Sequence, residues 1–156
     1  MTYQQSYKSP VGELIIKADD SAITEIKFGT FPLENKSSLT QLAVEQLDEY
    51  FQSKRTYFDL PLMPKGTEFQ KAVWAELVKI PISKTFSYGQ LAELVGKPKA
   101  ARAIGGAVGA NPIAIVIPCH RVLATDGKIT GYTGGDGIKT KRSLLDLEGA
   151  LVESSS

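Results

Sequence analysis

The chain has 156 residues, of which 42% are hydrophobic and 22% are charged, and its formal net charge at pH 7 is +1. A chain of this length and composition buries a hydrophobic core in one domain or two small ones, and intrinsic disorder is not expected. It contains one cysteine, Cys119, and one histidine, His120. These two residues cannot form an internal disulfide or a zinc site that needs several Cys and His ligands. We therefore expect no metal and a reducing, cytoplasmic location.

The sequence also argues against a membrane protein. No segment approaches the roughly 20 apolar residues that span a bilayer, and the polar residues 1–10 lack the apolar centre of a signal peptide. The 18 Lys and Arg residues nearly balance the 17 Asp and Glu residues. This balance argues against broad electrostatic attraction to membranes or nucleic acid, although it does not exclude a local basic strip.

The first third of the chain shows the alternating pattern of β-strands. Apolar side chains alternate in residues 12–18 and 23–28, and a short polar turn separates the two segments, which predicts a β-hairpin. Residues 37–54 carry apolar side chains at helical spacing, and residues 57–63 return to short extended structure that prolines interrupt. We expect these elements to form a small α/β domain over residues 1–63.

The remainder of the chain, residues 64–156, is predicted to be mostly helical. Thr67-x-x-Gln70 and Ser87-x-x-Gln90 match the capping box that opens helices. Further helices are expected over about residues 99–108 and 139–148. The helix that begins at Ser87 and the next one are joined by a tight Gly/Pro turn, which is the spacing of a helix-turn-helix. That spacing alone is weak support for DNA binding, because most such helix pairs are packing units.

The helix over residues 99–108 has an unusual composition. Besides several alanines it contains the adjacent Gly105 and Gly106, and each glycine costs about 1 kcal/mol relative to alanine in a helix. Either close helix packing or close approach of the backbone to a ligand, such as a DNA groove, would require their lack of side chains. Arg102 is the one long basic side chain inside this helix, after a basic lead-in. Without Asn, Gln or several Arg, such a helix cannot read base edges, so any DNA binding should be nearly independent of sequence.

The neighbouring Cys119 and His120 follow a continuous apolar run, residues 113–117, which we interpret as a buried strand. Most free cysteines are small buried hydrophobes, and this explanation stays open for Cys119. A glycine-rich loop, residues 126–137, comes next and has the freedom to wrap around a small planar ligand. Glu148 falls on the apolar face of the last helix, where a carboxylate needs a partner.

Cys, His and Glu side chains can form a relay that generates a reactive thiolate. The carboxylate orients the imidazole, and the imidazole accepts the proton of the thiol. Adjacent residues of an extended strand point to opposite faces, so Cys119 and His120 cannot meet directly if the strand continues. Either the backbone turns at this point or a water bridges the two side chains.

The segment Ile117-Pro118-Cys119-His120-Arg121-Val122 resembles the active-site signature of the O6-alkylguanine-DNA alkyltransferases, the methylated-DNA–protein-cysteine methyltransferases. The resemblance is strong over about residues 66–150, and the segment Ser9-Pro10-Val11-Gly12 with its hairpin suits the small N-terminal domain of the family. Further blocks follow the family in order and spacing: Phe69-Gln70, Ser87-Tyr88, residues 101–107, Asn111-Pro112, residues 131–135 and Leu144-Leu145-x2-Glu148-Gly149.

The resemblance implies an α/β fold, in which a ribonuclease H-like domain with an antiparallel sheet and a helix precedes a mostly helical domain with a winged helix-turn-helix. It implies direct-reversal DNA repair by a suicide enzyme that needs no cofactor. A methyl or other alkyl group would pass irreversibly from O6-alkylguanine, or from O4-alkylthymine, to Cys119 in a single turnover. The implied partner is double-stranded DNA that carries O6-alkylguanine, bound through its minor groove by a monomer and largely independently of sequence.

The resemblance also implies roles for single residues. Cys119 would be the nucleophile, His120 a base that acts through a water, and Glu148 the carboxylate that orients the imidazole. Tyr88 would donate a proton toward N3 of guanine, and Asn111 would hold the turn that supports the reactive segment.

Further residues are implied for the DNA surface and for the substrate pocket. Arg102 would enter the base stack as a finger that fills the gap left by a flipped nucleotide, while Gly105 and Gly106 would let the helix sit deep in the groove. The expected DNA-contacting set is completed by Ala101, Lys99 and Arg121. The pocket would be lined by Tyr132, Gly134, Val122 and Thr133, the last at a position where many relatives carry serine.

Two departures and two rival functions remain open. The loop over residues 136–140 looks longer than in many relatives, which leaves the size of the pocket open, and the cysteines of the adaptive-response zinc domain are absent. One rival is a non-enzymatic module of the alkyltransferase-like type, but such proteins replace the cysteine, typically with tryptophan. The other is a cysteine-dependent hydrolase or acyl transferase, which would need an oxyanion hole near Cys119 and would leave the helix-turn-helix unexplained.

Overall fold

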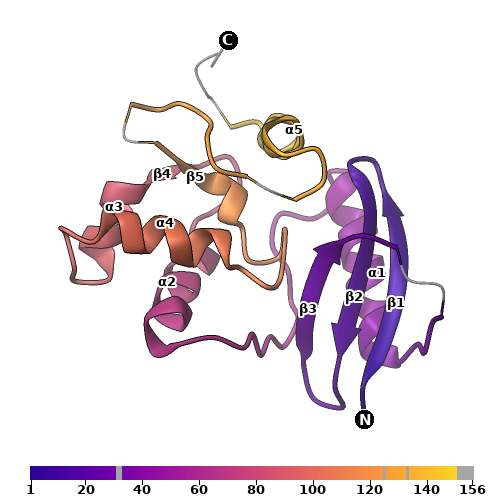
Figure 1. The fold of residues 1–156 in the computed structure, drawn as a ribbon. Helices are drawn as coiled ribbons and strands as arrows, with labels where there is room; N and C mark the ends of the chain where they lie inside the picture. Colours follow the sequence, from indigo (N-terminus) through magenta and orange to yellow (C-terminus); the bar gives the residue numbers. More distant parts are fainter. Residues whose placement is uncertain (31–32, 125, 133, 151–156) are drawn as a thin grey trace.

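The computed structural model of the chain describes residues 1–30, 33–124, 126–132 and 134–150. A small antiparallel sheet with one covering helix forms the N-terminal domain, and four helices dominate the described C-terminal domain (Figure 1). The N-terminal elements are β1 (Tyr3–Ser9), β2 (Gly12–Ala18), β3 (Ile23–Phe28) and α1 (Ser38–Phe51). The C-terminal elements are α2 (Glu68–Val78), β4 (Phe86–Ser87), α3 (Tyr88–Leu94), α4 (Ala101–Gly109), the 3-10 turn η1 (Cys119–Arg121), β5 (Val122–Leu123) and α5 (Ile138–Leu147).

The predicted hairpin is confirmed as β2 and β3. Asp19 shapes its turn, because one carboxylate oxygen accepts hydrogen bonds from the backbone N–H groups of Ser21 and Ala22 at 2.7 and 2.8 Å. The sheet has the order β1-β2-β3, and α1 packs against β1 and β2. In Figure 1, β3 is the strand on the side of the C-terminal helices, and this position brings it to the functional site.

Strand β1 was not predicted, because its sequence is polar. It pairs with β2 along its whole length, from Tyr3 opposite Ala18 to Ser9 opposite Gly12. Its one buried residue, Gln5, donates a hydrogen bond to Gln41 at 2.8 Å. Pairing with an apolar neighbouring strand and satisfied polar side chains therefore replace the alternating pattern that usually marks a strand.

The predicted helices are present with small shifts at their ends. The predicted capping boxes at Thr67 and Ser87 are confirmed. Each cap side chain accepts a hydrogen bond from the backbone N–H three residues on, and the cap residue's own backbone N–H donates to the side-chain oxygen of the glutamine at that position. Helices α3 and α4 pack together as the helix-turn-helix, and Trp74 of α2 donates a hydrogen bond to the carbonyl of Ala107 at 2.8 Å. The strand pair beside them, β4 with β5, is parallel and two residues long on each side.

The predicted buried strand over residues 113–117 is wrong. Ile113 alone makes a bridge, to Ile26 of β3, and the segment then folds into turns in which Ile115 adopts a φ of 69°. The apolar run is buried because it lies between the two domains, where Ile113, Ile115 and Ile117 are each no more than 1% exposed. The segment therefore packs against both domains, in the middle of one hydrophobic core that they share. The expected extended segment over residues 57–63 is likewise only a bridge, between Leu62 and Ile23.

None of the described helices combines the length and the apolar character that crossing a membrane would require.

Candidate active site

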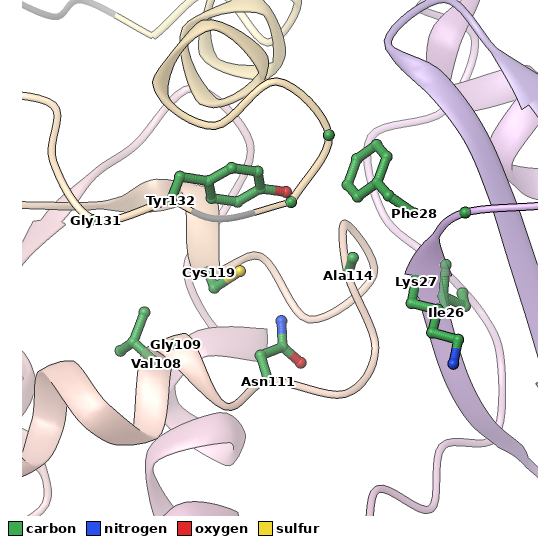
Figure 2. Close-up of a pocket in the computed structure, with 13 residues that line it drawn as sticks. Ile26, Lys27, Phe28, Val108, Gly109, Asn111, Ala114, Cys119, Gly131 and Tyr132 are labelled. Carbon is green, nitrogen blue, oxygen red and sulfur yellow. The ribbon is translucent and has the colours of Figure 1, made fainter.

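A pocket of about 510 Å³ opens beside Cys119 at the junction of the two domains (Figure 2). Figure 2 shows the sulfur of Cys119 facing the space between Asn111 and Tyr132, with Phe28 on the other side of that space. The walls come from four segments: the end of β3, the end of α4, the turn that precedes η1, and the glycine-rich loop. The lining residues are Ile26, Lys27, Phe28, Gly29, Val108, Gly109, Asn111, Ala114, Cys119, Gly131, Tyr132, Gly134 and Gly135.

Cys119 is the first residue of the 3-10 turn η1 and is half-buried. The backbone therefore turns between Cys119 and His120, which is one of the two solutions that the sequence left open. Burial raises the pKa of the thiol, while a hydrogen bond with Asn111 and the positive charge of Lys141 act in the opposite direction. Because burial dominates, Cys119 is a neutral thiol in the free protein, and it needs a base in order to become a nucleophile.

Asn111 fixes the turn that leads to Cys119. Its side-chain oxygen accepts a hydrogen bond from the backbone N–H of Ile113 at 3.0 Å, and its side-chain nitrogen donates to the carbonyl of Ile117 at 2.8 Å. These two bonds span the segment in which Ile115 has a positive φ, a conformation that β-branched residues rarely adopt. The turn therefore depends on the side chain of Asn111 as well as on packing.

His120 is fully buried, and its Nε2 atom lies 2.6 Å from Oε2 of Glu148. Burial lowers the pKa of the imidazole, and the carboxylate of Glu148 opposes this shift. A carboxylate only accepts hydrogen bonds, so Nε2 carries the hydrogen and Nδ1 holds the free lone pair. Nδ1 is buried and has no hydrogen-bond partner among the described residues. The lone pair of this atom is therefore available to accept a proton.

Glu148 caps the C-terminal end of α5 and is 6% exposed. It accepts two bonds from Arg121, at 2.7 Å on Oε1 and 2.9 Å on Oε2, and one from the hydroxyl of Tyr50 at 2.6 Å. Burial alone would raise the pKa of this carboxyl, but the hydrogen bonds from His120 and Arg121 outweigh burial and lower the pKa to about 2. The sequence-based expectation that this acid has partners is met by three side chains from two segments of the chain, η1 and α1.

The start of α4 forms an exposed surface. Ala101 and Arg102 are exposed there, and so is Lys99 in the preceding turn. A Cβ atom added to Gly105 or Gly106 would meet no atom within 4 Å in the part of the chain that the structure describes. Close helix packing among the described residues therefore does not explain these glycines.

The C-terminal residues 68–150 match the family described as 6-O-methylguanine DNA methyltransferase, DNA binding domain. Residues 2–64 match the family described as 6-O-methylguanine DNA methyltransferase, ribonuclease-like domain. The chain belongs to this family. The family relationship confirms the expected fold class, a ribonuclease-like N-terminal domain followed by a helical DNA-binding domain.

The similarity to individual methyltransferases extends over nearly the whole length of this chain. The methylated-DNA–protein-cysteine methyltransferase of Methanosarcina acetivorans is 40% identical over 95% of this chain and 99% of its own length. The protein of that name from Mycobacterium bovis is 43% identical over 95% of this chain and 93% of its own length. A crystal structure of Mycobacterium tuberculosis OGT in complex with DNA superposes with a TM-score of 0.85 at 43% identity, covering 94% and 92% of the two chains.

The structure of this methyltransferase changes two assignments that the resemblance had implied. Arg121 does not belong to the DNA-contacting set, because its guanidinium is buried on Glu148 and also donates to the carbonyl of Ile80 at 2.6 Å. Val122 does not line the pocket, because it is fully buried in β5, where it pairs with Phe86. Tyr132 and Gly134 do line the pocket, whereas Thr133 lies outside the described residues.

Tyr88 stands at the edge of the pocket, as the first residue of α3. It is half-buried, and burial raises the pKa of its phenol, so it remains a protonated donor. A Cβ atom on Gly131, which lines the pocket, would come within 3.1 Å of the Tyr88 hydroxyl. The hydroxyl can therefore reach a ligand that lies against Gly131.

Sequence reasoning missed three side chains at the site. Phe28 forms the wall that the N-terminal domain contributes, and its ring would lie 2.8 Å from a Cβ atom on Gly134. Lys141 of α5 is 1% exposed and donates to the carbonyls of Val122 and Thr130, and burial lowers its pKa to about 8. Tyr50 on α1 reaches Glu148 from the N-terminal domain. The apolar patterns had marked Phe28 and Tyr50 only as core residues, and no signal in the sequence singled out Lys141.

Within the residues that the structure describes, no three His, Cys, Asp or Glu side chains lie close enough together to hold a metal ion.

Proposed function

We propose that this methyltransferase repairs alkylated DNA by direct reversal, moving the alkyl group from O6 of guanine to Sγ of Cys119 once per molecule. The observation that carries the proposal is the arrangement around the pocket. A half-buried thiol faces the pocket, and the next residue is a neutral imidazole held by an ionised carboxylate. The family relationship over nearly the whole chain supports the same reaction and favours it over a non-enzymatic binding module.

The transfer is a direct displacement at the alkyl carbon. A bond forms between Sγ of Cys119 and this carbon while the bond from the carbon to O6 breaks, and the electron pair stays on the guanine. The thiol proton passes through a water to Nδ1 of His120, and Tyr88 donates a proton toward N3 to neutralise the departing base. The product on the protein is a thioether, which water does not hydrolyse at neutral pH, so the protein reacts once.

The geometry of α4 suits a flipped nucleotide. Val108 and Gly109, at the end of the helix, line the pocket, and the exposed Arg102 stands near its start. Arg102 and Val108 are six positions apart, which corresponds to about 9 Å along a helix axis. Arg102 can therefore fill the gap in the duplex while the extruded base enters the pocket.

The exposed Gly106 favours docking of α4 deep in the minor groove of double-stranded DNA, with little dependence on sequence. The approach of α4 without base-reading side chains is consistent with a lesion recognised in any sequence context. We further propose that the protein works as a monomer, because one chain supplies the side chains that the transfer uses. We also propose a cytoplasmic location, because a reducing compartment suits the free thiol of Cys119.

The decisive experiment is to incubate the protein with duplex DNA that contains O6-methylguanine and to determine peptide masses. The peptide with Cys119 should gain one methyl group, in an amount equal to the guanine restored, and Cys119→Ser should restore none. Repaired DNA with an unmodified Cys119 would overturn the assigned acceptor. Tight binding to the lesion without repair would instead support the non-enzymatic alternative.

A further inference from the structure

We propose that Tyr50, a residue of the N-terminal domain, is a positioning residue for the transfer, because its hydroxyl holds the Glu148 carboxylate in the orientation that His120 needs. This inference rests on the proposed function, since it adds a component to the same relay. Tyr50 does not line the pocket, and 98 positions separate it from Glu148 in the sequence. It would act on the reaction only through the carboxylate.

The contact is short and rigidly supported. The Tyr50 hydroxyl donates to Oε2 of Glu148 at 2.6 Å, and this oxygen also accepts from Nε2 of His120 at 2.6 Å. Tyr50 is 2% exposed, and its ring packs against Phe51 and Phe58 with centroid distances of 5.0 and 5.4 Å. The packing of the N-terminal domain therefore sets the position of a hydroxyl that the relay uses.

The hydroxyl also sets how strongly Glu148 attracts a proton on the imidazole. Arg121 donates one hydrogen bond to Oε1 of Glu148 and another to Oε2. Oε2 also accepts hydrogen bonds from Tyr50 and His120, so these two groups compete for the negative charge on this oxygen. Without the hydroxyl, more of this charge would face Nε2 and would favour the imidazolium form. We therefore expect Tyr50 to help keep His120 neutral, which is the state in which Nδ1 can accept the thiol proton.

Other charged and titratable groups also affect the pKa values of His120 and Tyr50. Arg121 and Lys141 lower the pKa of His120, Glu148 raises it, and burial is the largest cause of its net decrease. Tyr132 is the further titratable group that faces Tyr50. Burial and the neighbouring Glu148 raise the pKa of Tyr50, so its hydroxyl stays a donor at every pH at which the protein works.

The test is Tyr50→Phe, which removes only the hydroxyl. The single-turnover rate of methyl transfer at neutral pH should fall by about tenfold, the loss expected for one hydrogen bond to a buried charge. Because His120 is the only histidine in the chain, nitrogen NMR of its imidazole follows its titration directly. The midpoint should rise by about half a pH unit, which corresponds to a modest change in the charge that faces the ring.

The matched control is Tyr7→Phe. Tyr7 donates its hydroxyl to Asp48 of α1 at 3.1 Å and not to Glu148, so this variant should keep the wild-type rate and titration. The inference is overturned if Tyr50→Phe matches the control in both measurements. It is equally overturned if the rate falls while the titration of His120 stays unchanged, since that result indicates a packing role. Failure of the wild-type protein to methylate Cys119 would contradict the proposed function, and the NMR comparison would still decide the role of Tyr50.

Discussion

Glu148 is an ionised carboxylate in the core that the two domains share, and it forms hydrogen bonds with both a cation and a neutral base. Its two oxygens hold the guanidinium of Arg121, the imidazole of His120 and the hydroxyl of Tyr50. The sequence predicted the acid and the histidine as a pair, but the family resemblance placed Arg121 on the DNA surface, and the local pattern does not distinguish a buried arginine from a surface one. A buried carboxylate that pairs with a neutral histidine needs a cation, and Arg121 is that cation.

Replacing Glu148 with glutamine should destabilise the protein in a pH-dependent manner. The pKa of Glu148 lies at about 2, below its ordinary value of 4.5, so its contribution to stability is present above pH 4.5 and is lost as the pH falls toward 2. Near pH 7, Glu148→Gln should lower the free energy of unfolding by roughly 3 kcal/mol, because it leaves Arg121 buried without its carboxylate. Denaturant unfolding at several pH values measures the difference.

The difference between Glu148→Gln and the wild type should shrink as the pH falls from 4.5 toward 2. Asp146→Asn is the matched control, because Asp146 is an exposed carboxylate on the same helix, and this variant should keep the wild-type dependence on pH. A stability difference that stays constant over this range would show that the charge of Glu148 is not what stabilises the site.

Helices and turns that depend on contacts between near neighbours in the sequence were predicted correctly, whereas a segment whose shape depends on distant contacts was not. The capping boxes and the hairpin turn were predicted because their hydrogen bonds join residues two or three positions apart. The turn over residues 113–117 was mistaken for a strand, because an apolar run reports burial and not conformation. Its shape depends on Asn111, for which the resemblance had implied this supporting role, and on the bridge to Ile26, which the local sequence does not show.

Helix α4 carries a prediction that separates stability from DNA binding. Gly106 is exposed, and a Cβ atom there meets no neighbour among the described residues, so Gly106→Ala should raise the free energy of unfolding by about 0.5–1 kcal/mol through helix propensity alone. The same methyl group would stand between the helix backbone and a DNA groove. Affinity for duplex DNA should therefore fall while stability rises, as measured by thermal unfolding and fluorescence anisotropy.

Unchanged DNA affinity in a stabilised Gly106→Ala protein would contradict the groove approach through this face of α4. Ala103→Gly serves as the reciprocal control, because Ala103 is also exposed on α4. That change should destabilise the helix by a similar amount, about 0.5–1 kcal/mol, without adding any atom to the helix surface.

The two domains share one hydrophobic core, and both line the pocket beside Cys119. The hydrophobic cluster runs from Leu14 of β2 to Leu144 of α5, and β3 contributes both the bridge to Ile113 and the pocket wall at Phe28. The sequence predicted two adjoining units but gave no reason for the N-terminal domain to take part in chemistry. Contacts between distant segments explain this gap, since a pattern within one strand cannot show what its end will face.

The near-zero net charge bears on how the whole molecule meets DNA. The net charge is +1, and α4, the helix expected to enter the groove, is rich in glycine and alanine. The protein should therefore neutralise only about three phosphates. This number predicts a slope of about −3 when the logarithm of the binding constant is plotted against the logarithm of the salt concentration. Titration of duplex DNA at several salt concentrations measures the slope. A slope near −10, typical of proteins that neutralise many phosphates, would contradict binding through close fit in the groove. A shallow slope would show that shape, and not charge, brings this methyltransferase to its substrate.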